Sequence, residues 1–438
     1  MIRPLPISDF RWLNETEIEN FRVSDISEEA EYGESFEVDI EYPQELHDAQ
    51  NEYPLAPQKL EVTGQMLSPL QQKMRSNIHK QRYGETKEKM PPFRSTEKLV
   101  PNLMGKTNYI VNGLNLKFYI SMGMKITKIH RIVRYRQSKW LKPYIDFNTE
   151  KRRLATNDFE KDLFKLMNNA VFEKTLQNTR KQRQVTFVHT HEKAKRLVAH
   201  PLYTGYEALN DNLYAVERCP SSILFDKPIY AGFAILELSK LRMYDFHYNF
   251  VKKLYPGDMS KLCFTDTDSF LYLLKTKDIY RDMMLKHHDL FDFSNFNDNH
   301  PCFEGMTADE VHTIKEKNKK VLGRFKDELG GIPLREFVGL ASKMYGFILE
   351  EGEVKKLQGI IIAIVQRYLS FMQYKETLFE QKQMVTSMNV IRSKGHHLTT
   401  VKQTKISLSC FDDKRFIDED GVTTYAHGYC GKKKLKRK

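Results

Sequence analysis

Residues 263–272 read Cys-Phe-Thr-Asp-Thr-Asp-Ser-Phe-Leu-Tyr and place two carboxylates, Asp266 and Asp268, two positions apart. Apolar residues precede and follow this polar centre, a pattern typical of two short strands joined by a tight turn. Residues two apart on an extended chain share a face. Both carboxylates are therefore expected to project from the same end of a hairpin.

The pair has the chemistry of a cation site. Two close carboxylates repel each other unless a cation lies between them or one keeps its proton. Magnesium prefers hard oxygen ligands and leaves coordination positions open for substrate phosphates, so it suits this arrangement. A lone Asp-x-Asp triplet is also typical of solvated turns and calcium loops, and neighbouring motifs must decide between these interpretations.

The composition indicates a folded protein with a basic balance. The 438 residues are enough for two or three domains. Of these residues, 40% are apolar and 12% aromatic, which is enough to form hydrophobic cores. Lys and Arg number 69 against 57 Asp and Glu, which leaves a charge of +12. This excess indicates either a polyanionic partner or a solubilising surface charge.

The sequence carries no obvious address for a membrane or for export. No stretch approaches the roughly 20 apolar residues of a membrane span, and the N-terminus lacks the order of a signal peptide. The five cysteines are scattered without metal-site spacing, so reduced thiols are expected. We therefore expect an intracellular protein that has no membrane partner.

Two further segments carry polar side chains in a regular pattern. Asn157 followed by Glu160 predicts the start of a helix that runs from 158 to 177. Lys165 and Asn169 lie four positions apart on one stripe of that helix, and Lys343 and Tyr345 share one face of a predicted strand over 335–345. Taken alone, each pattern is also compatible with an ordinary solvated face.

The rest of the chain is predicted more coarsely. The first sixty residues are expected to be irregular with short strands, residues 74–98 to form a mobile loop, and residues 229–255 to form a long helix. The basic stretch 125–142 is a candidate nucleic-acid surface or a solvated face. Beyond 352 we expect helix and coil, ending in a basic tail at 432–438 that is a nuclear address, a phosphate-binding arm or a solvated terminus.

Three motifs in order carry a family resemblance. Lys-Leu-Met-Asn-Asn at 165–169, Thr-Asp-Thr-Asp-Ser at 265–269 and Lys-Met-Tyr at 343–345 resemble the C-terminal part of family B DNA polymerases. Within that family the chain is similar to the protein-primed branch of self-synthesising transposons and their viral relatives. The resemblance implies an α/β (α+β) fold with the palm, fingers and thumb of a right-hand polymerase, truncated at its N-terminus.

The resemblance also assigns roles to residues. Asp266 and Asp268 match the motif that binds two Mg2+ ions, Lys165 and Asn169 match nucleotide-binding positions, and Lys343 and Tyr345 match the motif that holds the primer strand. Thr267, between the two acids, is assigned to DNA binding. The implied partners are template and primer DNA, deoxynucleoside triphosphates and a priming protein.

The family pattern divides the chain into five regions. Residues 1–125 correspond to a palm remnant and the insertion that contacts the priming protein, and 126–178 to the fingers. Residues 179–225 correspond to an insertion linked to strand displacement and processivity. The palm follows at 226–350, with a thumb-like region and basic tail at 351–438.

Departures from the family pattern predict weak catalysis. Ala170 and Glu173 replace a serine and a glycine, and the acid would repel phosphate. The aspartate of the first polymerase motif belongs upstream of a segment like 3–13, and Asp39 imitates it without the right spacing. We therefore expect a DNA-directed DNA polymerase of a mobile element, nuclear in location, with little or no activity. The alternative is a DNA-binding protein that has lost the chemistry, and a nuclease would need more clustered acids.

Overall fold

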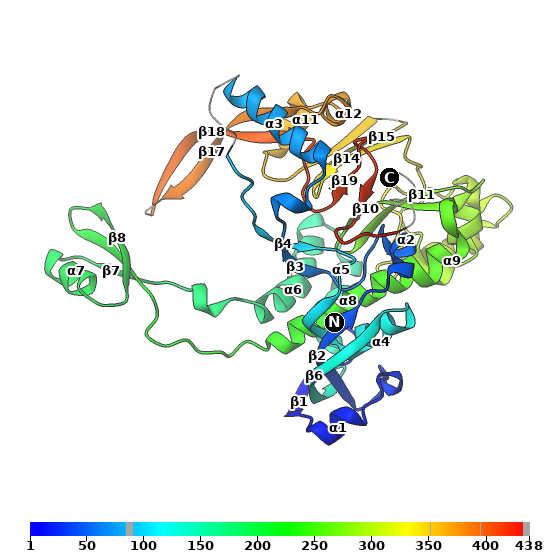
Figure 1. Cartoon of the computed structure of the whole chain (residues 1–438), viewed down its shortest axis with the longest axis horizontal. Coiled ribbons are helices and arrows are strands. Elements are labelled where there is room, and N and C mark those ends of the chain that lie inside the picture. Colours follow the sequence, from blue (N-terminus) through cyan, green and yellow to red (C-terminus); the bar gives the residue numbers. More distant parts are fainter. Residues whose placement is uncertain (85–90, 351, 395, 432–438) are drawn as a thin grey trace.

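The computed structural model describes residues 1–84, 91–350, 352–394 and 396–431, so the predicted basic tail at 432–438 lies outside the described residues. The chain forms a mixed α/β structure built from several small sheets and a set of helices around them (Figure 1). Among the described residues, none of the helices combines the length and the apolarity needed to cross a membrane. All five cysteines are free thiols, as predicted.

A four-stranded antiparallel sheet organises the N-terminal part. Its strands lie in the order β1 (Leu5–Trp12), β6 (Lys125–Ser138), β2 (Tyr32–Glu41) and β5 (Lys106–Asn112). The prediction of an irregular first sixty residues is wrong, because Phe36, Val38 and Ile40 alternate along β2 and are buried in the main core. The predicted boundary between 125 and 126 separates β6 from the sheet to which it belongs.

The basic stretch 125–142 is largely neutralised within this sheet. Its cations face carboxylates from β2 and the loop before it: Arg131–Glu37, Arg134–Glu34, Arg136–Glu31, Lys139–Glu29 and His130–Asp39. These pairs favour the solvated-face interpretation over a nucleic-acid surface. Asp39 also accepts a hydrogen bond from the Asn108 amide at 2.8 Å, so its carboxylate is engaged by the protein.

The helices predicted from capping signals are present. α6 (Asp158–Thr175) begins at the Asn157 N-cap, whose side chain accepts from the Glu160 amide, and it packs on α5 (Lys142–Leu154). α8 (Ile229–Tyr244) continues through the π-helical turn η5 (Asp245–Val251) into α9 (Lys252–Leu254). α6 and α8 approach closely at Gly232, where an added Cβ would lie 2.3 Å from the Thr175 hydroxyl oxygen.

Two predictions about loops are wrong. Residues 74–83 belong to α3 (Pro69–Tyr83), which starts at a capping box of Ser68 and Gln71, whereas residues 85–90 lie outside the described chain. Beyond 352, strands as well as helices follow. They are β16 (Gly352–Leu357), α11 (Ile362–Tyr368), α12 (Phe371–Phe379) and the long antiparallel hairpin of β17 (Gln383–Lys394) with β18 (His397–Ser409).

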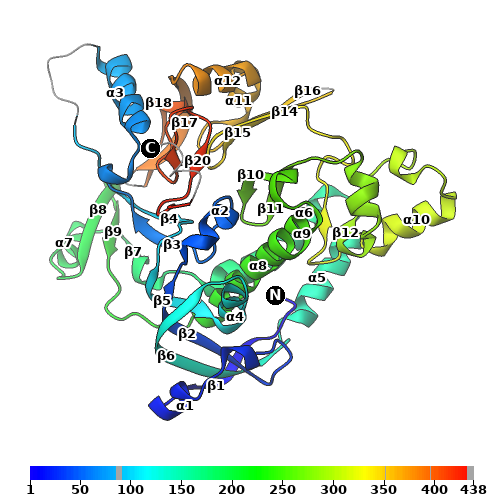
Figure 2. The same cartoon turned by 45° about the vertical axis from the view of Figure 1, so that its right-hand side comes forward.

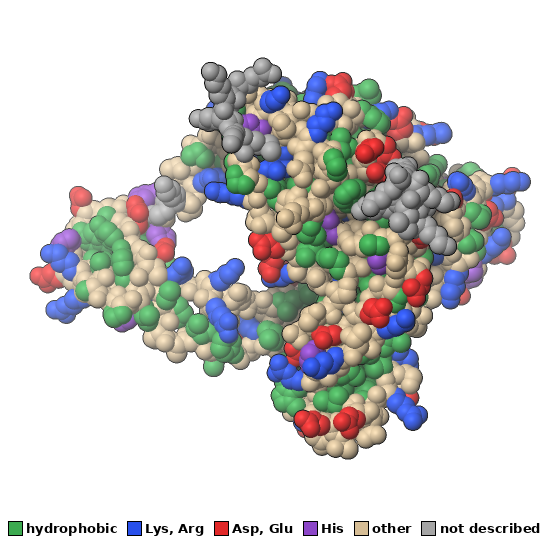
Figure 3. All heavy atoms as spheres, in the orientation of Figure 1, with side chains coloured by type: hydrophobic (Ala, Val, Ile, Leu, Met, Phe, Trp, Pro, Cys, Tyr) green, Lys and Arg blue, Asp and Glu red, His purple; other side chains and the backbone are tan. Residues whose placement is uncertain are grey.

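A small module extends away from the rest of the chain (Figure 1). It consists of the sheet β7 (Gln184–Val188), β9 (Leu213–Arg218) and β8 (Tyr203–Asn210) with α7 (His191–Val198). The tip of β17–β18 reaches it, because His396 and His397 lie 3.0 and 3.2 Å from carboxylate oxygens of Glu217 and Glu207. An opening separates this contact from the main body in the space-filling view (Figure 3).

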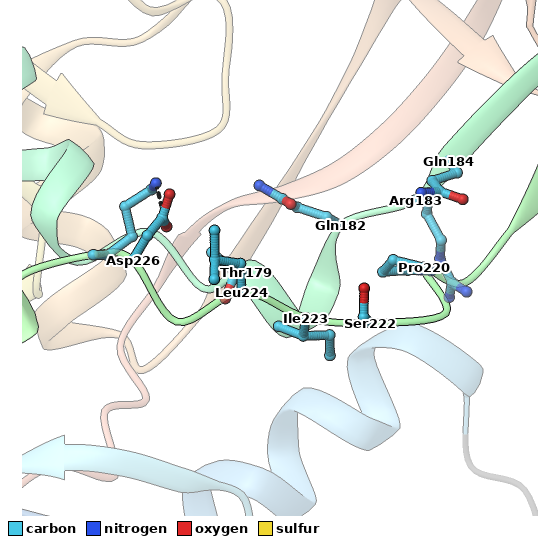
Figure 4. Close-up of a pocket in the computed structure, with 10 residues that line it drawn as sticks. Thr179, Gln182, Arg183, Gln184, Pro220, Ser222, Ile223, Leu224 and Asp226 are labelled. Carbon is cyan, nitrogen blue, oxygen red and sulfur yellow. Dashed lines mark hydrogen bonds and ion pairs between the residues drawn. The ribbon is translucent and has the colours of Figure 1, made fainter.

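The two segments that connect the module to the body run beside each other. They enclose a pocket of about 260 Å³ lined by Thr179, Arg183, Leu224 and neighbouring residues (Figure 4). The guanidinium of Arg183 donates to the Cys219 sulfur at 3.1 Å across the pair.

Shorter elements complete the fold. They are α1 (Glu15–Glu19), α2 (His47–Gln50), β3 (Gln58–Glu61), β4 (Glu97–Val100), α4 (Gly113–Ser121), β10 (Ser260–Asp266), β11 (Ser269–Leu274), β12 (Phe291–Asp292), α10 (Ala308–Lys317), β13 (Phe325–Lys326), β14 (Glu336–Ala341), β15 (Met344–Leu349), β19 (Phe416–Ile417) and β20 (Thr424–Tyr425).

Candidate functional site

The carboxylate pair lies at the tip of the predicted hairpin. β10 and β11 pair antiparallel with Asp266 opposite Ser269, which leaves Thr267 and Asp268 in the turn. The Asp268 amide donates to the Asp266 carbonyl at 2.6 Å, and the Ser269 hydroxyl donates to the same carbonyl at 3.2 Å. The carbonyl oxygen of Asp266 therefore accepts two hydrogen bonds within the turn, whereas the side chain of Asp268 is exposed.

The turn residue between the two acids is strained. Thr267 adopts a φ of 57°, in the left-handed region that β-branched residues rarely occupy. Such a conformation costs on the order of 1–3 kcal/mol and clusters at functional sites. Its hydroxyl donates to a carboxylate oxygen of Asp266 at 3.3 Å, so the same residue orients one of the two acids.

Lys343 and Tyr345 lie beside this tip. The predicted single strand over 335–345 is wrong, because β14 and β15 form a hairpin with Lys343 in its turn at a φ of 58°. The Lys343 ammonium is 3.9 Å from a carboxylate oxygen of Asp266. The Tyr345 ring packs against Phe264 of β10 with centroids 4.5 Å apart, and Figure 2 shows the two hairpins as neighbours.

The electrostatics of Tyr345 follow from this position. Burial raises the pKa of its hydroxyl first, and the negative charges of Asp266 and Glu328 raise it further. Tyr345 is therefore a neutral hydrogen-bond donor at neutral pH, next to a carboxylate and an ammonium.

Lys165 and Asn169 form a separate part of the predicted site. Both are exposed on α6, together with Ala170 and Glu173. In the described residues, no hydrogen bond, ion pair or ring contact joins them to the β10–β11 hairpin. The adjacent Asn168 is buried instead, and its amide donates to the Thr149 hydroxyl at 3.3 Å. The structure thus brings together Asp266, Asp268, Thr267, Lys343 and Tyr345. It leaves Lys165 and Asn169 of α6 apart from them.

Among the residues that contact the hairpin, sequence reasoning missed Glu52 and Tyr53. The Glu52 carboxylate accepts a hydrogen bond from the Leu262 amide of β10 at 3.2 Å, and the Tyr53 ring meets Phe270 of β11 edge-on at 5.5 Å. Their segment, Gln-Asn-Glu-Tyr-Pro at 50–54, has no motif that points to this contact.

The donor set fits one magnesium ion more readily than two. Asp266 and Asp268 supply carboxylate oxygens at a solvent-accessible tip, and Mg2+ commonly takes one or two carboxylates and completes its shell with water and phosphate oxygens. Within the described ranges, no group of three or more His, Cys, Asp or Glu side chains is placed to hold a metal ion. A two-metal cage would need a further ligand beside this pair.

Comparisons with known proteins give structural neighbours only. The chain matches no protein-family model, and it matches no curated protein. Phi29 DNA polymerase with primer-template DNA is similar over 92% of this chain and 54% of its own, with 12% identity and a TM-score of 0.47. Its ternary complex with incoming nucleotide substrates gives 10% identity, a TM-score of 0.47 and coverage of 92% and 55%. The orthorhombic form of that polymerase gives 12% identity, a TM-score of 0.41 and coverage of 86% and 58%.

The chain therefore spans little more than half the length of these neighbours.

Proposed function

We propose that this chain is a template-directed DNA polymerase module of the protein-primed family B type, with weak activity of its own. The observation that carries the proposal is the meeting of two hairpins. One presents Asp266 and Asp268 at its tip, and the other places the Lys343 ammonium 3.9 Å from Asp266. A paired carboxylate beside a cation and an aromatic hydroxyl suits the binding of metal, phosphate and primer together.

Each residue has a role in the proposal. Asp268 and Asp266 would hold a magnesium ion, which, when bound, neutralises triphosphate charge and polarises the reacting phosphate. Lys343 and Tyr345 would bind primer phosphates, with Thr267 against the DNA backbone. Lys165 and Asn169 would meet the triphosphate of the incoming nucleotide from α6.

The weak activity follows from three features of the site. Lys343 already neutralises part of the charge on Asp266, and the carboxylate pair supplies ligands for one ion. Glu173 is exposed on the same helix as Lys165 and Asn169 and would repel a triphosphate there. Priming-protein contact through residues 1–125, a mobile-element origin and a nuclear location belong to the same proposal.

Primer extension on a DNA template with magnesium tests the proposal. We expect slow, templated incorporation that falls to background in Asp268→Asn, because the exposed carboxylate of the pair is lost. Asp258→Asn is the matched control, since Asp258 is an exposed aspartate in the turn before β10 and lies away from the tip. Equal extension by Asp268→Asn and the unmodified chain would contradict the proposal.

A second candidate function is DNA binding without catalysis. The ion pair of Lys343 with Asp266 favours it, because Lys343 already neutralises part of the charge with which Asp266 would bind a metal ion. In this case the chain binds primer-template DNA with strong salt dependence and incorporates no nucleotide. The same extension assay, read beside a binding titration, separates the two functions.

A further inference from the structure

The segment 51–53 joins the candidate site to the C-terminal part of the chain. On the site side, Glu52 accepts hydrogen bonds from the Leu262 amide at 3.2 Å and from the Lys252 ammonium at 2.9 Å. Lys252 donates in turn to the Ser260 carbonyl at 2.9 Å. Strand β10, the first strand of the β10–β11 hairpin, is thus held by hydrogen bonds at both Ser260 and Leu262.

Tyr53 supports the same hairpin nearer its tip. Its ring meets Phe270 edge-on, with an interplanar angle of 88°. Phe270 is in turn the register partner of Thr265 across the hairpin. Thr265 and Phe270 directly precede and follow the four residues of the tip, so the position of Tyr53 bears on where the two carboxylates lie.

On the other side, Asn51 is fixed by residues that lie far along the sequence. The Arg415 guanidinium donates to the Asn51 carbonyl at 3.0 Å. The Asn51 side chain accepts from the Ala426 amide at 2.8 Å and donates to the Thr424 carbonyl at 3.3 Å. Arg415 also donates through Nε to the Thr424 hydroxyl at 2.8 Å, which ties it to the same strand.

We propose that Arg415 and Asn51 are positioning residues for the Asp266–Asp268 pair. The C-terminal residues 415–426 fix Asn51, and the adjoining Glu52 and Tyr53 then fix β10 and β11. None of these side chains is placed to touch a substrate in this account, so they act through the hairpin. The inference rests on the proposed function for its catalytic meaning, whereas the mechanical link stands on the contacts alone.

Hydrogen exchange measures the link without any need for activity. Arg415→Gln removes the guanidinium group that donates to Asn51 and Thr424. Asn51→Ala removes the contacts of the Asn51 side chain with Ala426 and Thr424 and leaves Arg415 in place. In both variants we expect exchange at the Leu262 and Asp268 amides to rise about tenfold, as local opening of the hairpin becomes easier. Exchange in β2 and β6 serves as the internal reference and stays unchanged. Asn249→Ala is the control, because Asn249 is exposed and bonds only within its own helical segment to Asp245.

Nucleotide binding then tests the consequence for the site. With magnesium, we expect Arg415→Gln to weaken binding of the correct nucleotide to the protein–primer–template complex about tenfold, since misplacement of the reacting groups by a fraction of an ångström is costly. Affinity for the DNA itself stays unchanged, and Arg415→Lys restores part of the loss because a lysine still reaches the Asn51 carbonyl.

The outcomes separate the inference from the proposed function. Faster exchange in the hairpin alone supports the positioning role, even if the unmodified chain binds no nucleotide, in which case the proposed function fails by itself. Unchanged hairpin exchange in both variants overturns the positioning role. If Arg415→Gln raises exchange throughout the chain, including β2 and β6, this variant has unfolded the chain. The exchange measured in Asn51→Ala then decides whether the positioning role holds.

Discussion

The Lys343 ammonium lies 3.9 Å from a carboxylate oxygen of Asp266, although the two residues come from different hairpins. Both side chains are about half exposed or less, at 50% and 35%, so water screens the pair and its contribution to stability is small. The contact matters because it places a cation next to one of two neighbouring carboxylates. A cation held beside one of two neighbouring acids can be exchanged for a magnesium ion or directed to a phosphate.

Replacing Lys343 tests its role toward DNA. Lys343→Ala is expected to weaken primer-template binding and to reduce the slope of log affinity against log salt by about 0.9, the loss of one phosphate contact. Titrations at several salt concentrations measure both quantities. Lys286→Ala removes an exposed lysine elsewhere on the chain and serves as the control, with the slope retained. An unchanged slope in Lys343→Ala means that Lys343 contacts no phosphate.

Under the proposed function, residues 179–225 correspond to the insertion linked to processivity, so the contact between the small module and the β17–β18 tip is expected to affect processivity. Glu207→Gln with Glu217→Gln removes both carboxylate charges that face His397 and His396. Exposed ion pairs contribute about 0–1 kcal/mol each to stability. Their loss should therefore weaken the contact between the β17–β18 tip and the small module while the chain stays folded. We expect shorter products per binding event and an unchanged rate for the first nucleotide.

Glu192→Gln, on the exposed face of α7, is the matched control for that experiment. Product lengths that do not differ between the double variant and the control would show that the contact has no part in holding DNA.

Lys106 predicts a pH-dependent stability. It is 2% exposed and donates to the backbone carbonyl and the side-chain oxygen of Asn102, and burial lowers the pKa of its ammonium to about 7. Between about pH 7 and the usual lysine pKa, the unfolded chain keeps a proton that the folded chain has released, so stability rises with pH across this window. Below pH 7 the buried ammonium is charged and disfavours the folded state.

Lys106→Met removes this titration. We expect the variant to be more stable than the unmodified chain at pH 6, by on the order of a few kcal/mol, and the difference to shrink as the pH rises toward 9. Urea unfolding at both pH values measures it, with the exposed Lys125→Met as control. A stability difference that is equal at the two pH values would rule out Lys106 as the titrating group.

Local patterns predicted the local structure well. The hairpin at 260–274 follows from a polar tip between apolar strands, and α6 begins where Asn157 and Glu160 indicate, because capping involves only neighbouring residues. The pattern around Lys343 predicts a strand, because a lysine side chain gives no signal of the positive φ that makes it a turn residue. The β17–β18 hairpin lacks a clear alternation of apolar and polar residues, because Val385, Ile391, Leu398 and Ile406 are exposed, so the period-two pattern of a half-buried strand does not predict it.

Long-range partners could not be predicted from the sequence. The carboxylates of residues 29–39 and the cations of β6 each looked like a separate charged stretch, and only the register of β2 with β6 pairs them. The same holds for Arg415 and Asn51, whose contact depends on how the C-terminal segment returns to the site. The family resemblance assigned residues to motifs, but the supports of those motifs lie outside them.

If the Asp266–Asp268 tip forms a nucleotide site on a primed template, the nucleotide complementary to the template must bind there more tightly than the other three. Primer-template DNA with a dideoxy-terminated primer is bound to the chain in magnesium, and each nucleotide is titrated in turn. The account predicts that only the nucleotide complementary to the template stabilises the complex, and that Asp268→Asn abolishes this stabilisation while DNA binding persists. If all four nucleotides stabilised the complex of the unmodified chain equally, this would contradict the prediction. The chain would then bind DNA without selecting the nucleotide complementary to the template.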